Sequence, residues 1–165
     1  QLIDVQLSFP FMALALSIAA VLGAGLAGIV VTLAISSWVL YARLVRGESL
    51  TMRRREFVEA AHALGIPSRR ILLRHVLPNV LGPVLVLATL HIGTAIITEA
   101  TLSFLGVGVP PTQPSLGTLI RIGNDFLFSG EWWITVFPGA WLVIMVLAIN
   151  LLGDWLRDAL NPKLR

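Results

Sequence analysis

The sequence predicts an all-α membrane protein, a polytopic bundle of transmembrane helices, and three observations support this fold class. Hydrophobic residues make up 56% of the chain and charged residues only 13%, whereas a soluble domain has about 25% charged residues. Four apolar stretches are long enough, or nearly so, to cross a hydrocarbon core of about 30 Å as helices. The charged residues gather between those stretches, where a polytopic protein meets water.

The apolar stretches define four predicted spans, at residues 7–23, 26–44, 79–106 and 132–153. The first is short and carries Pro10 near its start, and a small-residue turn leads from it into the second. The third can kink at Pro83, and the fourth contains Pro138. Such prolines are tolerated in a membrane because neighbouring helices satisfy the carbonyl groups that they leave free.

The arginines predict the orientation of the chain. Eight of the twelve basic residues lie around the segment between the second and third spans: Arg43, Arg46, Arg53, Arg54, Arg55, Arg69, Arg70 and Arg74. The segment between the third and fourth spans holds only Arg121. Because basic residues collect on the cytoplasmic side, we expect residues 45–78 and the C-terminus in the cytoplasm and residues 107–131 outside.

The outer segment combines a stiff start with an amphipathic end. Three prolines within VGVPPTQPSLG favour an extended path. Apolar residues from Leu116 to Leu127 then recur at helical spacing, which predicts a short helix lying on the outer membrane surface. Trp132 and Trp133 follow it, at the position of an aromatic belt.

Composition also excludes several kinds of function. The chain has no cysteine, and therefore no disulfide, thiolate nucleophile or cysteine-ligated metal. It has no paired histidines of the HExxH type and no GxxxxGK[ST] loop for binding ATP. Its net charge of +3 lies beside membrane spans and favours lipid headgroups over nucleic acid. We expect no cofactor, no metal and no enzymatic activity.

An amphipathic segment interrupts the apolar sequence between residues 56 and 78, EFVEAAHALGIPSRRILLRHVLP. Phe57, Ala60, Ala61 and Leu64 follow the spacing i, i+3, i+4, i+7 of one helical stripe. The two alanines make the stripe shallow, which suits a groove on another protein. The alternative is a helix that lies on the membrane and only seals the loop.

The same segment contains its own stop signals. Gly65 stands where a helix ends in left-handed geometry, and Pro67 prevents its continuation. A second short helix over RRILLRHVL is expected to end at Pro78. The sequence therefore predicts a helix, a sharp turn and a second helix, held under the membrane by flanking arginines.

Polar residues in the third span are candidates for a translocation path. Glu99 is an ionisable group near its outer end, and His91, Thr94 and Thr98 accompany it along the helix. Charged groups in a membrane are costly to bury and often functional. The alternative is that these groups form hydrogen bonds within the bundle.

The motifs resemble those of a known family. EAAHALG, with Glu59, Ala60, Ala61 and Gly65, followed by HVLP, is similar to the EAA loop of binding-protein-dependent ABC importer permeases. ATLSFLGVGVPPTQPSLGTLI, WWITVFPG and INLLGDWLRDALNPKLR resemble the dipeptide, oligopeptide and nickel subgroup, and within it the second permease of a heterodimeric pair. Trp155 and Asn161 depart from the subgroup pattern, which often has Gly and Asp there.

The resemblance implies the helical transmembrane domain of an ABC type I importer, in which this loop forms a coupling helix that docks on a cytoplasmic ATPase. It carries an ATPase-coupling role to six residues: Glu59, Ala60, Ala61, Leu64, Gly65 and Pro78. It implies as partners a second permease subunit, ATP-binding subunits and an extracytoplasmic solute-binding protein, in the cell inner membrane. Such permeases usually have six spans, so we expect four of six here, as part of a longer protein.

Two other readings of the sequence stay open. A self-powered secondary transporter or channel would need ion-coordinating groups at mid-membrane depth, and Pro83 and Pro138 give it weak support. A membrane-anchored scaffold would use the cytoplasmic helices to recruit a soluble partner. For an importer, the sequence leaves the solute open among dipeptides, oligopeptides, nickel and glutathione.

Overall fold

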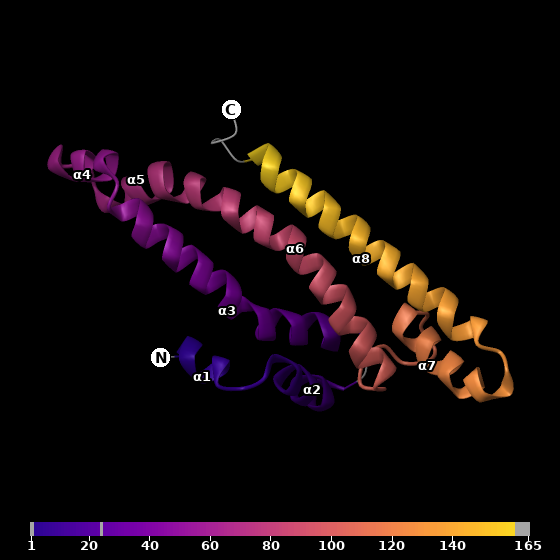
Figure 1. Cartoon of the computed structure of the whole chain (residues 1–165). Coiled ribbons are helices and arrows are strands. Elements are labelled where there is room, and N and C mark those ends of the chain that lie inside the picture. Colours follow the sequence, from indigo (N-terminus) through magenta and orange to yellow (C-terminus); the bar gives the residue numbers. More distant parts are fainter. Residues whose placement is uncertain (1, 24, 161–165) are drawn as a thin grey trace.

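The computed structural model describes residues 2–23 and 25–160, and every regular element within those residues is a helix. In chain order the elements are α1 (Leu2–Leu7), α2 (Phe11–Leu22), α3 (Leu26–Arg53), α4 (Glu56–Ala63), α5 (Ser68–Ile71), the π-helical turn η1 (Leu72–Val76), α6 (Leu77–Phe104), α7 (Leu116–Phe126), the 3₁₀ turn η2 (Leu127–Ser129) and α8 (Trp133–Leu160). The molecule is elongated, with α4 and α5 at one end and α7 at the other (Figure 1). The predicted all-α fold class is confirmed.

Within the described residues, three helices are long and apolar enough to cross a membrane: Leu26–Arg53, Ser68–Phe104 and Trp133–Ala159. They correspond to the second, third and fourth predicted spans. The predicted first span contains α2, whose 12 residues extend about 18 Å. Pro10 precedes α2, and Gly23, at φ 83°, ends it. A membrane crossing by residues 7–23 stays a prediction.

Two helices extend beyond the spans expected from hydropathy. Helix α3 continues to Arg53, past residue 44, and α8 continues to Leu160, past residue 153. No proline interrupts either extension, and a helix satisfies its own backbone hydrogen bonds in water as well as in lipid. The ends of these helices therefore form rigid projections beyond the apolar part of the molecule.

The short helix expected to end at Pro78 instead continues into α6, so that expectation is wrong. Residues Leu72–Val76 form a π-helical turn, in which the N–H of Leu77 donates to the carbonyl of Leu72. A proline lacks an N–H group and crowds the carbonyl one turn earlier. The wider π turn takes up this defect without breaking the helix, which runs from Ser68 to Phe104.

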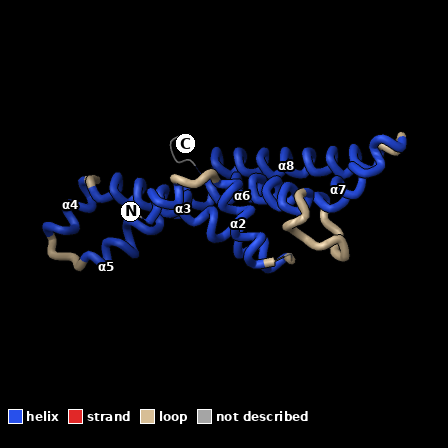
Figure 2. Tube along the Cα trace, turned by 90° about the horizontal axis from the view of Figure 1, so that it is seen from below, coloured by secondary structure: helices blue, strands red, loops and turns tan. Residues whose placement is uncertain are grey.

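Helix α7 packs closely on α6 and α8 because its glycines leave room for neighbouring backbone. A Cβ atom on Gly117 would collide with the backbone of Ala100 in α6. One on Gly123 would lie 2.7 Å from the carbonyl carbon of Ile134 in α8. Figure 2 shows α7 against one end of α8, and α6 alongside both. Ser115 caps the start of α7 through its side chain.

Replacing Gly123 with Val should destabilise this end of the molecule. The new side chain has no space against Ile134, so α7 and α8 must separate, at a cost of about 1–3 kcal/mol. Gly139→Ala in α8 is the matched control, because nothing lies within 4 Å of its Cβ position. Thermal unfolding in detergent should show a lower midpoint for Gly123→Val and an unchanged or higher one for Gly139→Ala. Equal midpoints for the two variants would contradict the packing.

Candidate functional site

Helix α4 ends in a hydrogen-bonded motif that depends on one glycine. The N–H of Ile66 donates to the carbonyl of Ala61 at 3.1 Å, and the N–H of Gly65 donates to that of His62 at 3.0 Å. These two bonds form a Schellman motif. Gly65 has φ 73° and open space around its Cβ position, so glycine is required there by backbone conformation and not by crowding. The predicted left-handed end of the helix is confirmed.

The inward face of α4 is fixed by a small hydrophobic cluster. Val58 and Ala61 of α4 are 2% and 6% exposed and pack against three buried residues of the continuous helix, Ile71, Val76 and Val80. We call these five residues the α4 cluster. Ile66, just after the Schellman turn, packs against the cluster, so the turn and the cluster together hold α4 in place.

The outward face of α4 carries apolar side chains that the described residues leave uncovered. Leu64 is 80% exposed and Phe57 is 46% exposed, while Glu59 and Ala60 are also exposed. The ring of Phe57 lies tilted against the ring of His75, and the ring centroids are 6.1 Å apart.

The four apolar residues of the predicted stripe therefore differ in their surroundings. Ala61 is buried in the molecule's own cluster, whereas Phe57, Ala60 and Leu64, on the same side of the helix, remain exposed. We call these three the α4 outer face. Sequence reasoning did not single out Val58, although its spacing of three residues from Ala61 indicates a second apolar face.

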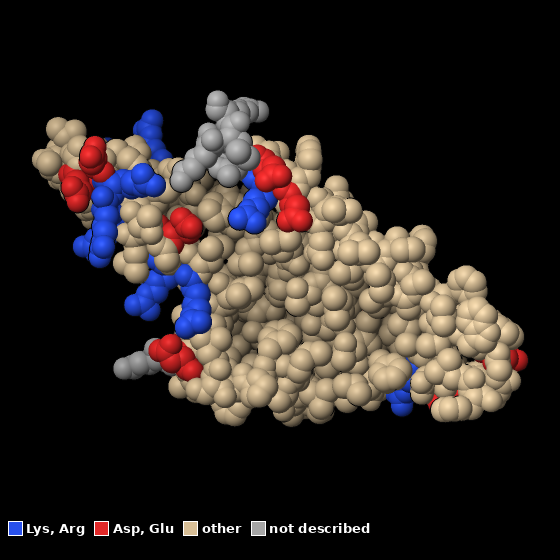
Figure 3. Space-filling model, viewed as in Figure 1, with Lys and Arg blue, Asp and Glu red and all other residues tan. Residues whose placement is uncertain are grey.

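Charge is concentrated at the same end of the molecule. Glu56 and Glu59 lie in the first turn of α4, where a helix dipole favours carboxylates. Arg53, Arg54 and Arg55 come directly before that turn. Figure 3 shows most of the visible blue and red side chains around α4 and the ends of α3 and α8, with a broad uncharged middle. This pattern agrees with a water-exposed end next to a membrane-embedded body.

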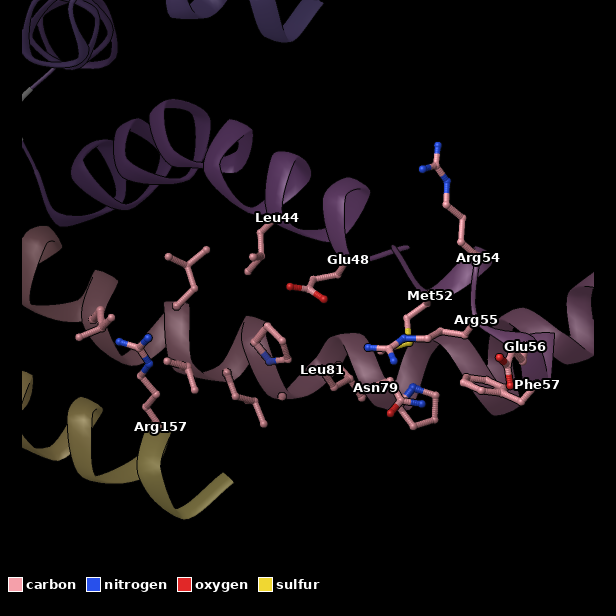
Figure 4. A pocket seen from close by; sticks show the side chains of 17 residues that line it. Leu44, Glu48, Met52, Arg54, Arg55, Glu56, Phe57, Asn79, Leu81 and Arg157 are labelled. Atoms are coloured by element: carbon pink, nitrogen blue, oxygen red, sulfur yellow. The ribbon is translucent and has the colours of Figure 1, made fainter. Parts of the chain in front are cut away.

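An open groove lies behind α4, between α3, α6 and the end of α8, with a volume of about 1550 Å³. Its lining runs from Arg54 and Asn79 near α4 to Leu44 and Leu90 further along the helices. Glu48 of α3 and Arg157 of α8 extend toward it from opposite sides (Figure 4). We call this space the inner groove.

The residues proposed for a translocation path are engaged in hydrogen bonds. His91 is joined to Tyr41 of α3, with 3.0 Å between its Nδ1 atom and the tyrosine oxygen. The hydroxyl of Thr98, which is 3% exposed, donates to the carbonyl of Thr94 at 2.8 Å. Thr94 itself has an exposed side chain.

Glu99 is half-buried and accepts a hydrogen bond of 2.7 Å from the hydroxyl of Ser103, one turn further along α6. Ser103 is fully buried and also accepts from the N–H of Val109, at 3.0 Å. Glu99 therefore supports the turn by which the chain leaves α6. The spacing of four residues between Glu99 and Ser103, about one helical turn, is the sequence signal for this contact.

Pro78, Gly65 and the other proposed coupling residues lie in one region, at the junction of α4 with the continuous helix. Pro78 lies just after the π turn and is exposed. No group of three or more metal-ligating side chains occurs among residues 2–23 and 25–160.

Fold and site together define a polytopic helical membrane protein that presents a short, firmly packed helix beyond its membrane-embedded part. Comparison with known families agrees with this description over the whole chain. Residues 1–165 match the family of binding-protein-dependent transport system inner membrane components, and the chain belongs to that family.

Curated relatives share 42% identity with the chain. One is a Brucella suis biovar 1 (strain 1330) protein whose name describes a peptide transport system permease, aligned over 165 residues, all of this chain and 55% of the relative. Another is the glutathione transport system permease protein GsiD of Escherichia coli O1:K1 / APEC, aligned over 163 residues, 98% of this chain and 53% of the relative. The chain spans about half the length of these relatives.

Gly65→Val should disturb the end of α4, because a β-branched residue at positive φ costs about 1–2 kcal/mol. Gly65→Asn is the matched control, since asparagine tolerates left-handed geometry and the site has open space. Thermal unfolding of the purified protein should show a lower midpoint for the valine variant and little change for the asparagine variant. A valine variant as stable as the wild type would contradict the assigned role of the glycine.

Proposed function

We propose that the protein acts as a permease subunit of an ATP-driven importer, in which the α4 outer face docks in a groove of a separate ATP-binding subunit. One observation carries the proposal: α4 is packed on its inner side by the α4 cluster and still exposes Phe57, Ala60 and Leu64. A helix that only lay on lipid would need large residues across its exposed face, and the centre of this face is a single alanine.

In this proposal the chain supplies movement and no bond chemistry. Closure of the ATP-binding subunits displaces α4, and the continuous helix carries that displacement into α6. The spans then move as rigid bodies and open the path on alternate sides of the membrane. The arginine-rich end, residues 45–78, and the C-terminus lie in the cytoplasm, and residues 107–131 face the solute-binding protein outside.

The proposed partners include a second permease subunit, with which this chain forms a heterodimer and shares the path. One face of α8 is left uncovered within the chain, and its exposed residues include Trp141, Ile144 and Leu151. Such a face suits either lipid or the spans of the second permease in the inner membrane. We propose a peptide or a similar small solute as cargo, since relatives are named for transport of peptides and of glutathione.

Single cysteines test the docking, because residues 1–165 contain none. A photo-crosslinker attached at Ala60 in the full-length permease, within native membranes, should yield an adduct with a protein that carries a GxxxxGK[ST] loop. The neighbouring Ala61 is 6% exposed and is the matched control, expected to yield little adduct. Adducts to lipid alone at Ala60 would contradict docking and favour an interfacial helix and a self-powered transporter.

We also propose that the polar face of α6 with His91, Thr94, Thr98 and Glu99 borders the path. Glu99→Gln keeps an oxygen that accepts from Ser103, so membrane insertion should stay normal. If the charge takes part in transport, uptake of di- and tripeptides should fall about tenfold, the effect of roughly 1.4 kcal/mol. Uptake at the wild-type level in this variant would show that the charge of Glu99 has no role in transport, and would leave Glu99 only its structural contact with Ser103.

A further inference from the structure

Helix α4 is carried by two arms, the end of α3 and the start of the continuous helix that leads into α6. The arms join at their tip, where Met52 of α3 and Val84 of α6 pack against the α4 cluster. Behind the tip they diverge (Figure 1), and the inner groove opens between them. Because the groove is open space, direct packing does not set the distance between the arms along it.

Tyr41 and His91 connect the two arms at the far end of the groove. The tyrosine oxygen lies 3.0 Å from Nδ1 of His91, and the two rings meet edge to face with centroids 5.5 Å apart. Tyr41 lies about one turn before the groove residue Leu44, and His91 directly follows the groove residue Leu90. The pair therefore stands at the base of the arms.

This contact differs from the hydrogen bonds of three other polar residues of α6. The hydroxyls of Thr89, Thr98 and Thr101 donate to carbonyl groups of α6 itself, at 2.7 to 2.8 Å. Such bonds satisfy the hydrogen-bonding capacity of the hydroxyl group, but they do not connect α6 to a second helix. The bond between Tyr41 and His91 joins two different helices, through residues that lie 50 positions apart in sequence.

We propose that Tyr41 and His91 are positioning residues that set the spacing of the two arms, so that α3, α4 and α6 move as one body. With this pair intact, a displacement of α4 reaches both spans. Without it the arms spread at their base and absorb part of the displacement. The effect on transport rests on the proposed docking function, whereas the spacing itself does not.

Spin labels can report the spacing in the full-length permease within the assembled transporter. Cysteines at Leu50 of α3 and Ile92 of α6, which are 53% and 48% exposed, carry the labels.

Tyr41→Phe keeps the ring and removes the hydroxyl, and His91→Phe removes the nitrogen that bonds to it. His91→Gln keeps a polar group and is the conservative variant. Uptake of radiolabelled trialanine or glutathione per ATP hydrolysed is measured in parallel, without labels.

Both phenylalanine variants should broaden the distance distribution and lower uptake per ATP about threefold. A threefold change corresponds to the average free energy of a hydrogen bond between membrane helices. The double variant should be no worse than either single variant, because both break the same bond. His91→Gln should give a distance distribution close to that of the wild type, because it keeps a polar group that can bond to the Tyr41 hydroxyl. Thr101→Val is the matched control, since it removes a bond within α6 only, and it should leave the distance unchanged.

A wild-type distance distribution in Tyr41→Phe would overturn the proposal, as would a double variant in which the two single effects add. Reduced stability without broadening would also overturn it, since that result assigns the pair a packing role alone. Broadening in Tyr41→Phe together with an Ala60 crosslinker that captures only lipid would support the spacing role and reject the docking function. The two proposals therefore fail on different measurements.

Discussion

The α4 cluster is the constraint on which the proposed docking surface depends. Helix α4 has eight residues, and isolated helices shorter than about 12–15 residues are marginal in water. It is therefore helical because Val58 and Ala61 are buried against the continuous helix. That contact fixes the rotation of α4 about its axis, and it leaves the side chains of Phe57 and Leu64, which lie next to Ala61 on the helix, exposed. Docking requires no further ordering of this helix, which lowers the entropic cost of binding a partner.

The cluster in turn depends on the helix passing through Pro78. Val76 lies in the π turn and Val80 lies beyond the proline, and both are buried in the same cluster. If the helix ended at Pro78, the position of Val80 relative to Val76 would depend on a loop. The π turn keeps both residues on one rigid element, so that α4 is attached to α6 without a flexible joint. A local defect in hydrogen bonding thus preserves the mechanical continuity of the site.

Local signals in the sequence predicted the features that depend on a single residue or a single helix. The left-handed geometry at Gly65, the all-α fold class and the family all agree with prediction. Three of the four predicted spans correspond to helices of membrane length within the described residues. The direction of Ala61 was not predictable, because an apolar stripe shows that a face is covered and not which neighbour covers it. Pro78 was predicted to end the helix for a similar reason. The α4 cluster stabilises a helix that continues through Pro78, but its residues come from separate segments and local sequence does not reveal their contact. The pairing of Tyr41 with His91 links distant residues by tertiary contact alone.

Helix α6 connects these features along the length of the molecule. At one end Val80 belongs to the α4 cluster, and near its middle His91 meets Tyr41 of α3. At its other end Ser103 holds Val109, while the N–H of Gly25 at the start of α3 donates to the carbonyl of Gly108. Helices α3 and α6 are thus tied at their tip, near the middle and close to the end of α6, where Gly108 follows it. Independent movement of either helix would break at least one of these ties, so the structure favours their rotation together as one rigid pair.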